Sequence, residues 1–209
     1  MINSEIRSRI INILDDTFRT VDECYEHNDE SSSKADFSKA KSRIIFPCYS
    51  KTYRNGERRI SEQELRFLFI ESFNHYCEKY GWDAYYSVET PTNEPHSFSG
   101  EKTKGGRSAR IDVCIHDNQG KRICLIEFKS GNPEISHYKN DLVKLTEETK
   151  EGGICFFVQL LESQRSNTMK SIMSKVRSCL GKTIYVCHTI TSKYKGTKYV
   201  SSEPIENCI

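Results

Sequence analysis

The chain has 209 residues, and its 31 Lys and Arg against 29 Asp and Glu give a formal net charge of +2. Hydrophobic residues make up 36% of it and charged residues 29%, which is compatible with a globular domain. No apolar run approaches the roughly 18 residues of a membrane-spanning helix, and the N-terminus lacks the basic and apolar regions of a secretory signal. We therefore expect one cytoplasmic domain with a small helical extension.

The nine cysteines stand at positions 24, 48, 77, 114, 124, 155, 179, 187 and 208. Their number is odd and no two have the C-x-x-C spacing of many zinc sites. Several lie in apolar, strand-like runs, where a free cysteine behaves as a small hydrophobic residue. Reduced thiols are therefore expected rather than a disulfide framework or a zinc site.

The pattern of apolar and capping residues predicts helices in the first third of the chain. Apolar residues recur every three or four positions over residues 4–25, which predicts one long amphipathic helix. A short helix is expected over 35–43. A second long helix is marked at its start by Ser61, with Glu64 at the spacing of a capping box, and at its end by Gly81.

The middle of the chain predicts three strands. Residues 82–89 are rich in aromatic side chains and predict the first strand. The polar segment 90–106 is rich in Pro and Gly and predicts a long loop. Residues 109–116 and 121–130 then predict two strands joined by a tight turn at Asp117-Asn118-Gln119-Gly120.

The last third alternates helices and strands. Helices are expected over residues 134–149 and 166–179, on the same helical periodicity. The continuous apolar runs 154–161 and 183–190 predict strands that are buried on both faces. The tail from Thr191 is polar, with Tyr194 and Tyr199 as candidates for an edge pairing.

The predicted order is therefore helix, three strands, helix, strand, helix, strand. A meander followed by two β-α-β units makes a mixed central sheet with helices on both faces. The predicted fold class is α/β.

Three charged residues interrupt the apolar strands of the predicted hairpin. Asp112 lies within Ile111-Asp112-Val113, and Glu127 and Lys129 lie within Ile126-Glu127-Phe128-Lys129. Side chains two residues apart point to the same face of a strand, so Glu127 and Lys129 share a face. Asp112 on the paired strand is expected opposite or diagonal to Glu127. Charges buried in strands are costly unless they are paired or bind a metal ion.

Two carboxylates beside one amine suit metal-dependent hydrolysis of a phosphodiester. Mg²⁺ prefers oxygen ligands, and Asp112, Glu127, a backbone carbonyl of the second strand and water would supply them. Such an ion lowers the pKa of a bound water. Lys129 is expected to orient that water and to stabilise charge that develops on the phosphate.

This pattern resembles the PD-(D/E)xK nuclease superfamily, which has the restriction-endonuclease-like fold. The resemblance covers about residues 61–190, although Ile111 stands where some members have proline. It implies a three-layer core with Asp112, Glu127 and Lys129 as catalytic positions, and Mg²⁺ or Mn²⁺ as cofactor. It also implies a DNA endonuclease of a restriction, repair or phage-defence type, and it allows a homodimer.

On this interpretation, residues 1–50 are an N-terminal helical extension and residues 51–209 form the nuclease-like domain. Members of the superfamily commonly add a glutamate from the first core helix. Glu62 and Glu64 are the candidates here, and Glu62 is favoured because it lies on the side of the apolar stripe, as in archaeal Holliday-junction resolvases. Glu64 has an ordinary explanation as the capping-box partner of Ser61.

We expect a nucleic acid as the partner of this protein, and we expect no interaction with a membrane. No acidic residue occurs from Ser163 to Ser202, where eight basic residues stand. The candidate contacts with phosphates are Lys102, Lys104, Arg107 and Arg110 around the predicted strands, and Tyr138 and Lys139 on the helix that follows. The ordinary alternatives stay open: a solvated basic surface, a surface loop and an amphipathic helix.

No zinc-protease, nucleotide-binding or serine-hydrolase motif competes with this interpretation. The rival function is a catalytically inactive module on the same fold that binds nucleic acid or protein. A second rival is a surface or assembly protein without a polyanionic partner. Cleavage of a plasmid and the salt dependence of binding separate the three.

Overall fold

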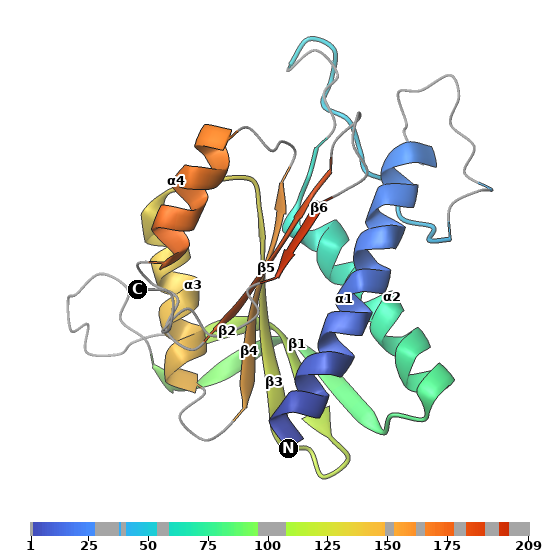
Figure 1. The fold of residues 1–209 in the computed structure, drawn as a ribbon, viewed down its shortest axis with the longest axis vertical. Coiled ribbons are helices and arrows are strands. Elements are labelled where there is room, and N and C mark those ends of the chain that lie inside the picture. Colours follow the sequence, from blue (N-terminus) through green and yellow to red (C-terminus); the bar gives the residue numbers. More distant parts are fainter. Residues whose placement is uncertain are drawn as a thin grey trace.

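Within the described part of the chain, six strands form one mixed sheet between helices (Figure 1). The computed structural model describes residues 2–27, 38, 41–53, 59–95, 108–148, 153–161, 166–177, 183–190 and 197–200. The strands are β1 (Ala84–Pro95), β2 (Ser108–Asp117), β3 (Arg122–Ser130), β4 (Ile154–Leu161), β5 (Ile184–Thr189) and β6 (Thr197–Val200). The helices are α1 (Ile2–His27), α2 (Glu62–Tyr80), α3 (Ile135–Glu148) and α4 (Ser166–Arg177).

The strands pair in chain order from β1 to β6. The pairs β1–β2 and β2–β3 are antiparallel, β3–β4 and β4–β5 are parallel, and β5–β6 is again antiparallel. The chain crosses through α3 between β3 and β4 and through α4 between β4 and β5. The predicted α/β class with a mixed central sheet is therefore confirmed, and the pairing changes from antiparallel to parallel at β3 and back again at β5.

The sheet is covered on both faces, α1 and α2 lying on one side and α3 and α4 on the other (Figure 1). The alternation of side chains along β4 shows the two cores. Phe156 and Val158 belong to the core under α1 and α2, whereas Phe157 belongs to the core under α3 and α4. All eight residues of β4 are buried, as the apolar run predicts for a central strand.

Helix α2 is capped at both ends as the sequence predicts. The Ser61 side chain accepts a hydrogen bond from the Gln63 backbone N–H at 3.3 Å, and Gly81 ends the helix in the left-handed conformation with φ of 62°. Glu64 is buried and forms an ion pair with Arg59, so the contact that the structure gives it is this pair and not the capping box. The cap fixes Glu62 in the first turn, at the end of α2 that faces the sheet.

The structure corrects the predicted extent of the first strand. β1 continues from Glu89 to Pro95, although residues 90–95 were expected to open a loop. Thr90 and Thr92 are buried, and the backbone of Thr90 pairs with that of Ile111. Pro91 is compatible with this strand because β1 lies at the edge of the sheet, where a missing N–H is tolerated. The rest of the predicted loop, residues 96–107, lies outside the described residues.

Two other expectations fall partly outside the described residues. Most of the short helix predicted over 35–43 does so, and residues 41–43 are not helical. In the tail, β6 pairs with β5 and places Tyr199 opposite Cys187, so an edge pairing is present there. Tyr194 lies outside the described residues.

Seven of the nine cysteines lie in the part of the chain that the structure describes. The described cysteines at 24, 48, 77, 114, 124, 155 and 187 are all unbridged. None of the described helices combines the length and apolar character that crossing a membrane requires.

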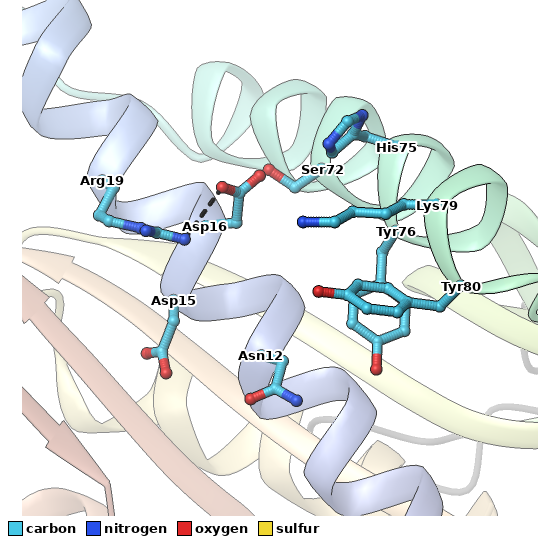
Figure 2. A pocket seen from close by; sticks show the side chains of 9 residues that line it. All are labelled: Asn12, Asp15, Asp16, Arg19, Ser72, His75, Tyr76, Lys79 and Tyr80. Carbon is cyan, nitrogen blue, oxygen red and sulfur yellow. Dashed lines mark hydrogen bonds and ion pairs between the residues drawn. The ribbon is translucent and has the colours of Figure 1, made fainter.

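Helix α1 is anchored by apolar packing and by charged contacts. Ile10 and Leu14 are fully buried in the core that α2 shares. At the surface, the two oxygens of Asp16 lie 3.1 and 3.0 Å from Lys41 Nζ, and one of them lies 3.2 Å from Arg19. Asp16, Arg19 and Ser72 line a groove of about 540 Å³ between α1 and α2. Figure 2 shows Asp16 beside Arg19 and Ser72.

Replacement of Asp16 by Asn is expected to destabilise the protein near pH 7 by about 0.5–1 kcal/mol. Burial by itself would raise the pKa of Asp16, but the contacts with Lys41 and Arg19 outweigh it and lower that pKa. A carboxyl with a lowered folded-state pKa stabilises the fold above its unfolded-state pKa, and this contribution is lost as the pH falls through the folded-state value.

Urea denaturation from pH 7 down to pH 4 and below checks this prediction. The difference between Asp16→Asn and the wild type should narrow as the pH falls below about 4. Glu23→Gln, which removes the same charge from an exposed position of α1, serves as control. A destabilisation by Asp16→Asn that does not change with pH would contradict the role of the ion pairs.

Candidate active site

Strands β2 and β3 separate at the position of Asp112 and Glu127. The two strands pair from His116 to Val113, and Val113 lies opposite Ile126. If the pairing continued by one residue, Asp112 would lie opposite Glu127. There the Phe128 backbone N–H donates to Asp112 Oδ2 at 2.8 Å. The carboxylate thus receives an N–H that a continuing antiparallel pair would offer to a backbone carbonyl. The structure therefore brings Asp112 to the Glu-x-Lys segment, as the hairpin predicts.

Glu127 and Lys129 lie on the face of β3 that α3 covers. They lie two and four residues after Leu125, so all three side chains point to the same face of the strand. Leu125 belongs to the core under α3 and α4. Glu127 is 2% exposed. Lys129 Nζ lies 2.7 Å from Asp141 Oδ2 and 3.4 Å from Glu62 Oε1. Lys129 therefore connects the start of α2 with α3.

Glu62 reaches this site from the first turn of α2. Its Oε1 accepts a hydrogen bond from the Ser130 backbone N–H at 3.4 Å, in addition to the contact with Lys129. About 40% of its side chain is exposed, so it stands at the rim of the cluster. Of the two candidate glutamates, Glu62 is the one that the structure places beside Lys129.

Helix α3 contributes two charged residues that sequence reasoning missed, Asp141 and Lys144. Lys144 Nζ lies 2.8 Å from Glu127 Oε1 and 3.0 Å from Asp141 Oδ1, and it donates to the Arg110 backbone carbonyl at 3.0 Å. Asp141 thus stands between Lys144 and Lys129. A signal for them was present, because Asp141 and Lys144 are three residues apart on α3, and each adjoins a buried leucine, Leu142 and Leu145 respectively.

The opposite side of the site carries an arginine. Arg66 Nη1 contacts Glu89 and lies 3.5 Å from Asp112 Oδ1, and Nη2 contacts Gln63. Glu89 has a φ of 49°, which is unusual for a residue other than glycine. It lies at the β1 position opposite Asp112, between the Val88 and Thr90 pairs. Strained backbone of this kind is often found at functional sites.

The carboxylates of the cluster have raised pKa values. Burial raises the pKa of Glu127 well above its ordinary value, and the neighbouring Asp112 and Asp141 raise it further, which Lys144 only partly offsets. Burial also raises the pKa of Asp112, against the lowering effects of the Phe128 N–H and Arg66. The concentration of negative charge around Glu127 would be relieved by an added cation.

The two lysines remain ammonium ions. Burial alone would lower the pKa of Lys129, but the nearby Asp141, Glu62 and Glu127 outweigh it and raise that pKa. The same balance raises the pKa of Lys144, through Glu127 and Asp141. At neutral pH both side chains therefore act through their charge and their donors, and neither is poised to accept a proton.

The donor set fits a hard divalent cation. Glu127 Oε1 and Asp141 Oδ2 are buried oxygens whose angles to the nearby ammonium groups are not those of hydrogen bonds, so each retains accepting capacity. Carboxylate oxygens are the ligands that Mg²⁺ and Mn²⁺ prefer. Among the described residues, no three Asp, Glu, His or Cys side chains already converge as a metal site. The ammonium group of Lys144 lies between the carboxylates of Glu127 and Asp141.

Of the remaining predicted residues, Arg110 adds only its backbone carbonyl to the carboxylates and lysines of this cluster, as an acceptor for Lys144. Tyr138 is fully buried, and its hydroxyl bonds to Gln159, so it does not present a surface to a nucleic acid. Lys139 is exposed on α3, and Arg110 is exposed on β2 with Glu89 at 3.9 Å. Lys102, Lys104 and Arg107 lie outside the described residues.

Replacement of Asp141 by Asn is expected to destabilise the protein by roughly 2–4 kcal/mol, because it removes the carboxylate that two largely buried ammonium groups share. Urea denaturation at pH 7 measures the change. Glu134→Gln, an exposed position just before α3, carries the same change in charge and should lie close to the wild type. Equal stabilities of the two variants would show that Asp141 does not hold the cluster together.

Comparison with known proteins does not place the chain in a family. No protein-family model and no curated protein matches it. One similar solved structure is described as "The structure of Pyrococcus Furiosus SfsA in complex with Ca2+". It is 12% identical, covers 78% of this chain and 71% of its own, and gives a TM-score of 0.37. A similarity at this level assigns neither a family nor an activity.

Proposed function

We propose that this protein is a metal-dependent phosphodiesterase that hydrolyses nucleic acid, with DNA endonuclease as its main activity. The observation that carries the proposal is the contact of the Asp112 carboxylate with the Phe128 N–H where β2 and β3 part, beside Glu127 and Lys129 on one face of β3. Glu62 joins them from the capped end of α2. Four side chains from three elements thus supply the acids and the cation that the reaction needs.

Asp112 and Glu127 would hold Mg²⁺ or Mn²⁺, and Glu62 would support the ligand shell from the rim. The bound ion would supply Lewis-acid polarisation of the phosphate and a lowered pKa for a bound water. The raised pKa values of Asp112 and Glu127 fit this role, because a cation favours the ionised form of both carboxyls.

Lys129 would position the attacking water and stabilise negative charge on the phosphate. Its raised pKa keeps it positively charged, so its contribution is electrostatic and geometric. The candidate contacts Arg110 and Lys139 are exposed and would bind phosphates away from the reacting centre. Lys102, Lys104 and Arg107 stay candidate contacts with phosphates on the basis of the sequence.

The element order and the cluster also support membership of the PD-(D/E)xK superfamily, in a restriction, repair or phage-defence role. The mixed sheet, the acid of β2 and the Glu-x-Lys of β3 are the features in favour. The division into an extension at 1–50 and a nuclease-like domain at 51–209 stays a prediction, as do the homodimer and the cytoplasmic location.

Plasmid nicking in Mg²⁺ tests the activity. The wild type should convert supercoiled to relaxed DNA, and Lys129→Ala should lower the rate by roughly 100-fold, as loss of a charge-stabilising donor does in other enzymes. Asp112→Asn and Glu127→Gln should abolish the stimulation by Mg²⁺. Lys121→Ala, at the exposed turn of the same hairpin, is the matched control and should retain full activity.

Circular dichroism and urea denaturation confirm that each variant is folded before its rate is compared. Nicking by Lys129→Ala at the wild-type rate would exclude the proposed role of Lys129. EDTA should stop the wild-type reaction, and added Mg²⁺ should restore it.

The alternative is a catalytically inactive module that binds nucleic acid or protein. The contact of Lys144 with Glu127 favours it, because an internal cation already accompanies the buried carboxylate. This alternative predicts no nicking by the wild type, together with DNA binding that weakens steeply as salt is raised. Nicking that depends on Mg²⁺ and on Glu127 would exclude it.

A further inference from the structure

Lys144 is the cation that faces the most deeply buried carboxylate of the site. Three oxygens surround its ammonium group at 2.8–3.0 Å: Glu127 Oε1, Asp141 Oδ1 and the Arg110 carbonyl. Only 8% of Lys144 is exposed. A buried lysine is rare unless its charge is compensated, so its position depends on these oxygens.

The other cations of the site are engaged elsewhere. Arg66 contacts Glu89 and Gln63 and reaches Asp112 only at 3.5 Å. Lys129 is held by Asp141 at 2.7 Å, with Glu62 as its second partner. Lys144 is therefore the cation at contact distance from Glu127 in the described site.

We propose that Lys144 is a built-in counter-ion that neutralises Glu127 in the metal-free protein and moves aside when a divalent ion binds. The inference rests on the proposed metal role of Asp112 and Glu127. Two cations within a few ångströms of one carboxylate repel each other strongly. Lys144 therefore sets the metal affinity of the site, and it acts as a positioning residue for Glu127.

The contacts of Lys144 allow such a movement. Of its three surrounding oxygens, the Arg110 carbonyl accepts a well-formed hydrogen bond, whereas the contact with Glu127 has the distance but not the angles of one. Asp141 lies on the same helix, three residues before Lys144. On leaving Glu127, the ammonium would keep Asp141 and the Arg110 carbonyl, so its charge would stay compensated.

Asp141 couples this movement to Lys129. Its Oδ1 faces Lys144 and its Oδ2 faces Lys129, so one carboxylate holds both lysines. A shift of Lys144 towards Asp141 would weaken the hold of Asp141 on Lys129. Binding of the ion would thereby release Lys129 towards a phosphate, which connects the counter-ion to the proposed catalysis.

Titration with Mn²⁺, followed by calorimetry, tests the proposal on the full chain. Lys144→Met keeps the length of the side chain and removes its charge, and it should bind Mn²⁺ about tenfold more tightly than the wild type. Without metal the variant should have a lower Tm than the wild type, and saturating Mn²⁺ should raise its Tm by more. Lys144→Arg keeps the charge and should bind Mn²⁺ no more tightly than the wild type.

Further variants separate the possible results. Lys144→Gln can still donate to the Arg110 carbonyl and replaces Lys144→Met if that variant does not fold. Lys121→Met removes an exposed charge and should leave Mn²⁺ binding unchanged. Adding Asp112→Asn to Lys144→Met should abolish the gain in affinity, because the ion then lacks a ligand.

If the wild type binds Mn²⁺ and neutral variants at Lys144 bind it equally or less tightly, the counter-ion role is overturned while the proposed function stands. If neither the wild type nor the variants bind Mn²⁺, the proposed metal site itself is wrong and the counter-ion role is overturned with it. Tighter binding by the neutral variants that persists with Asp112→Asn would place the ion elsewhere and would also overturn the proposal.

Discussion

The burial of one carboxylate, that of Glu127, governs the arrangement of the site. An ionised carboxyl inside a protein is costly unless a partner compensates its charge, and Glu127 is almost fully buried on β3, an interior strand of the sheet. Lys144 meets it from α3 and must itself be compensated, which Asp141 does, and Asp141 in turn holds Lys129. The inner face of α3 near β3 therefore carries a chain of alternating charges beside its apolar contacts through Leu142 and Leu145. Any partner that enters the site, whether a metal ion or a phosphate, has to take a place in this chain.

The topology explains why the cluster forms at this point of the sheet. β3 pairs antiparallel with β2 on one side and parallel with β4 on the other, so the pairing changes direction at β3. In open α/β sheets ligands commonly bind beyond the carboxyl ends of the parallel strands. Glu127 and Lys129 lie in the last part of β3, and Asp112 lies where β2 has begun to diverge from it. The capped end of α2 brings Glu62 to the same end of the strand.

The elements with a clear period could be predicted from the sequence, as α2 and β4 show. In α2, the Ser61 and Gly81 caps coincide with the two ends of the apolar stripe. Caps can be predicted from the sequence because their hydrogen bonds join residues within about one helical turn of each other. The extension of β1 to Pro95 could not be predicted in this way. Its residues read as a loop, and they form a strand because β2 offers backbone partners and the core accepts the side chains of Thr90 and Thr92. Such pairing depends on a distant segment and overrides local preference.

The sequence alone determined which strands carry acids and a lysine, and that Glu127 and Lys129 share a face, because strand geometry imposes a period of two. It also singled out the helix after β3, but it selected Tyr138 and Lys139 on it. Only the tertiary structure decided that Asp141 and Lys144 are the members of α3 that enter the site. Helical periodicity says which residues share a face, whereas the rotation and height of α3 against β3 depend on packing between segments far apart in the chain. The same packing decided that Lys144 lies beside Glu127, a contact that no local pattern contains.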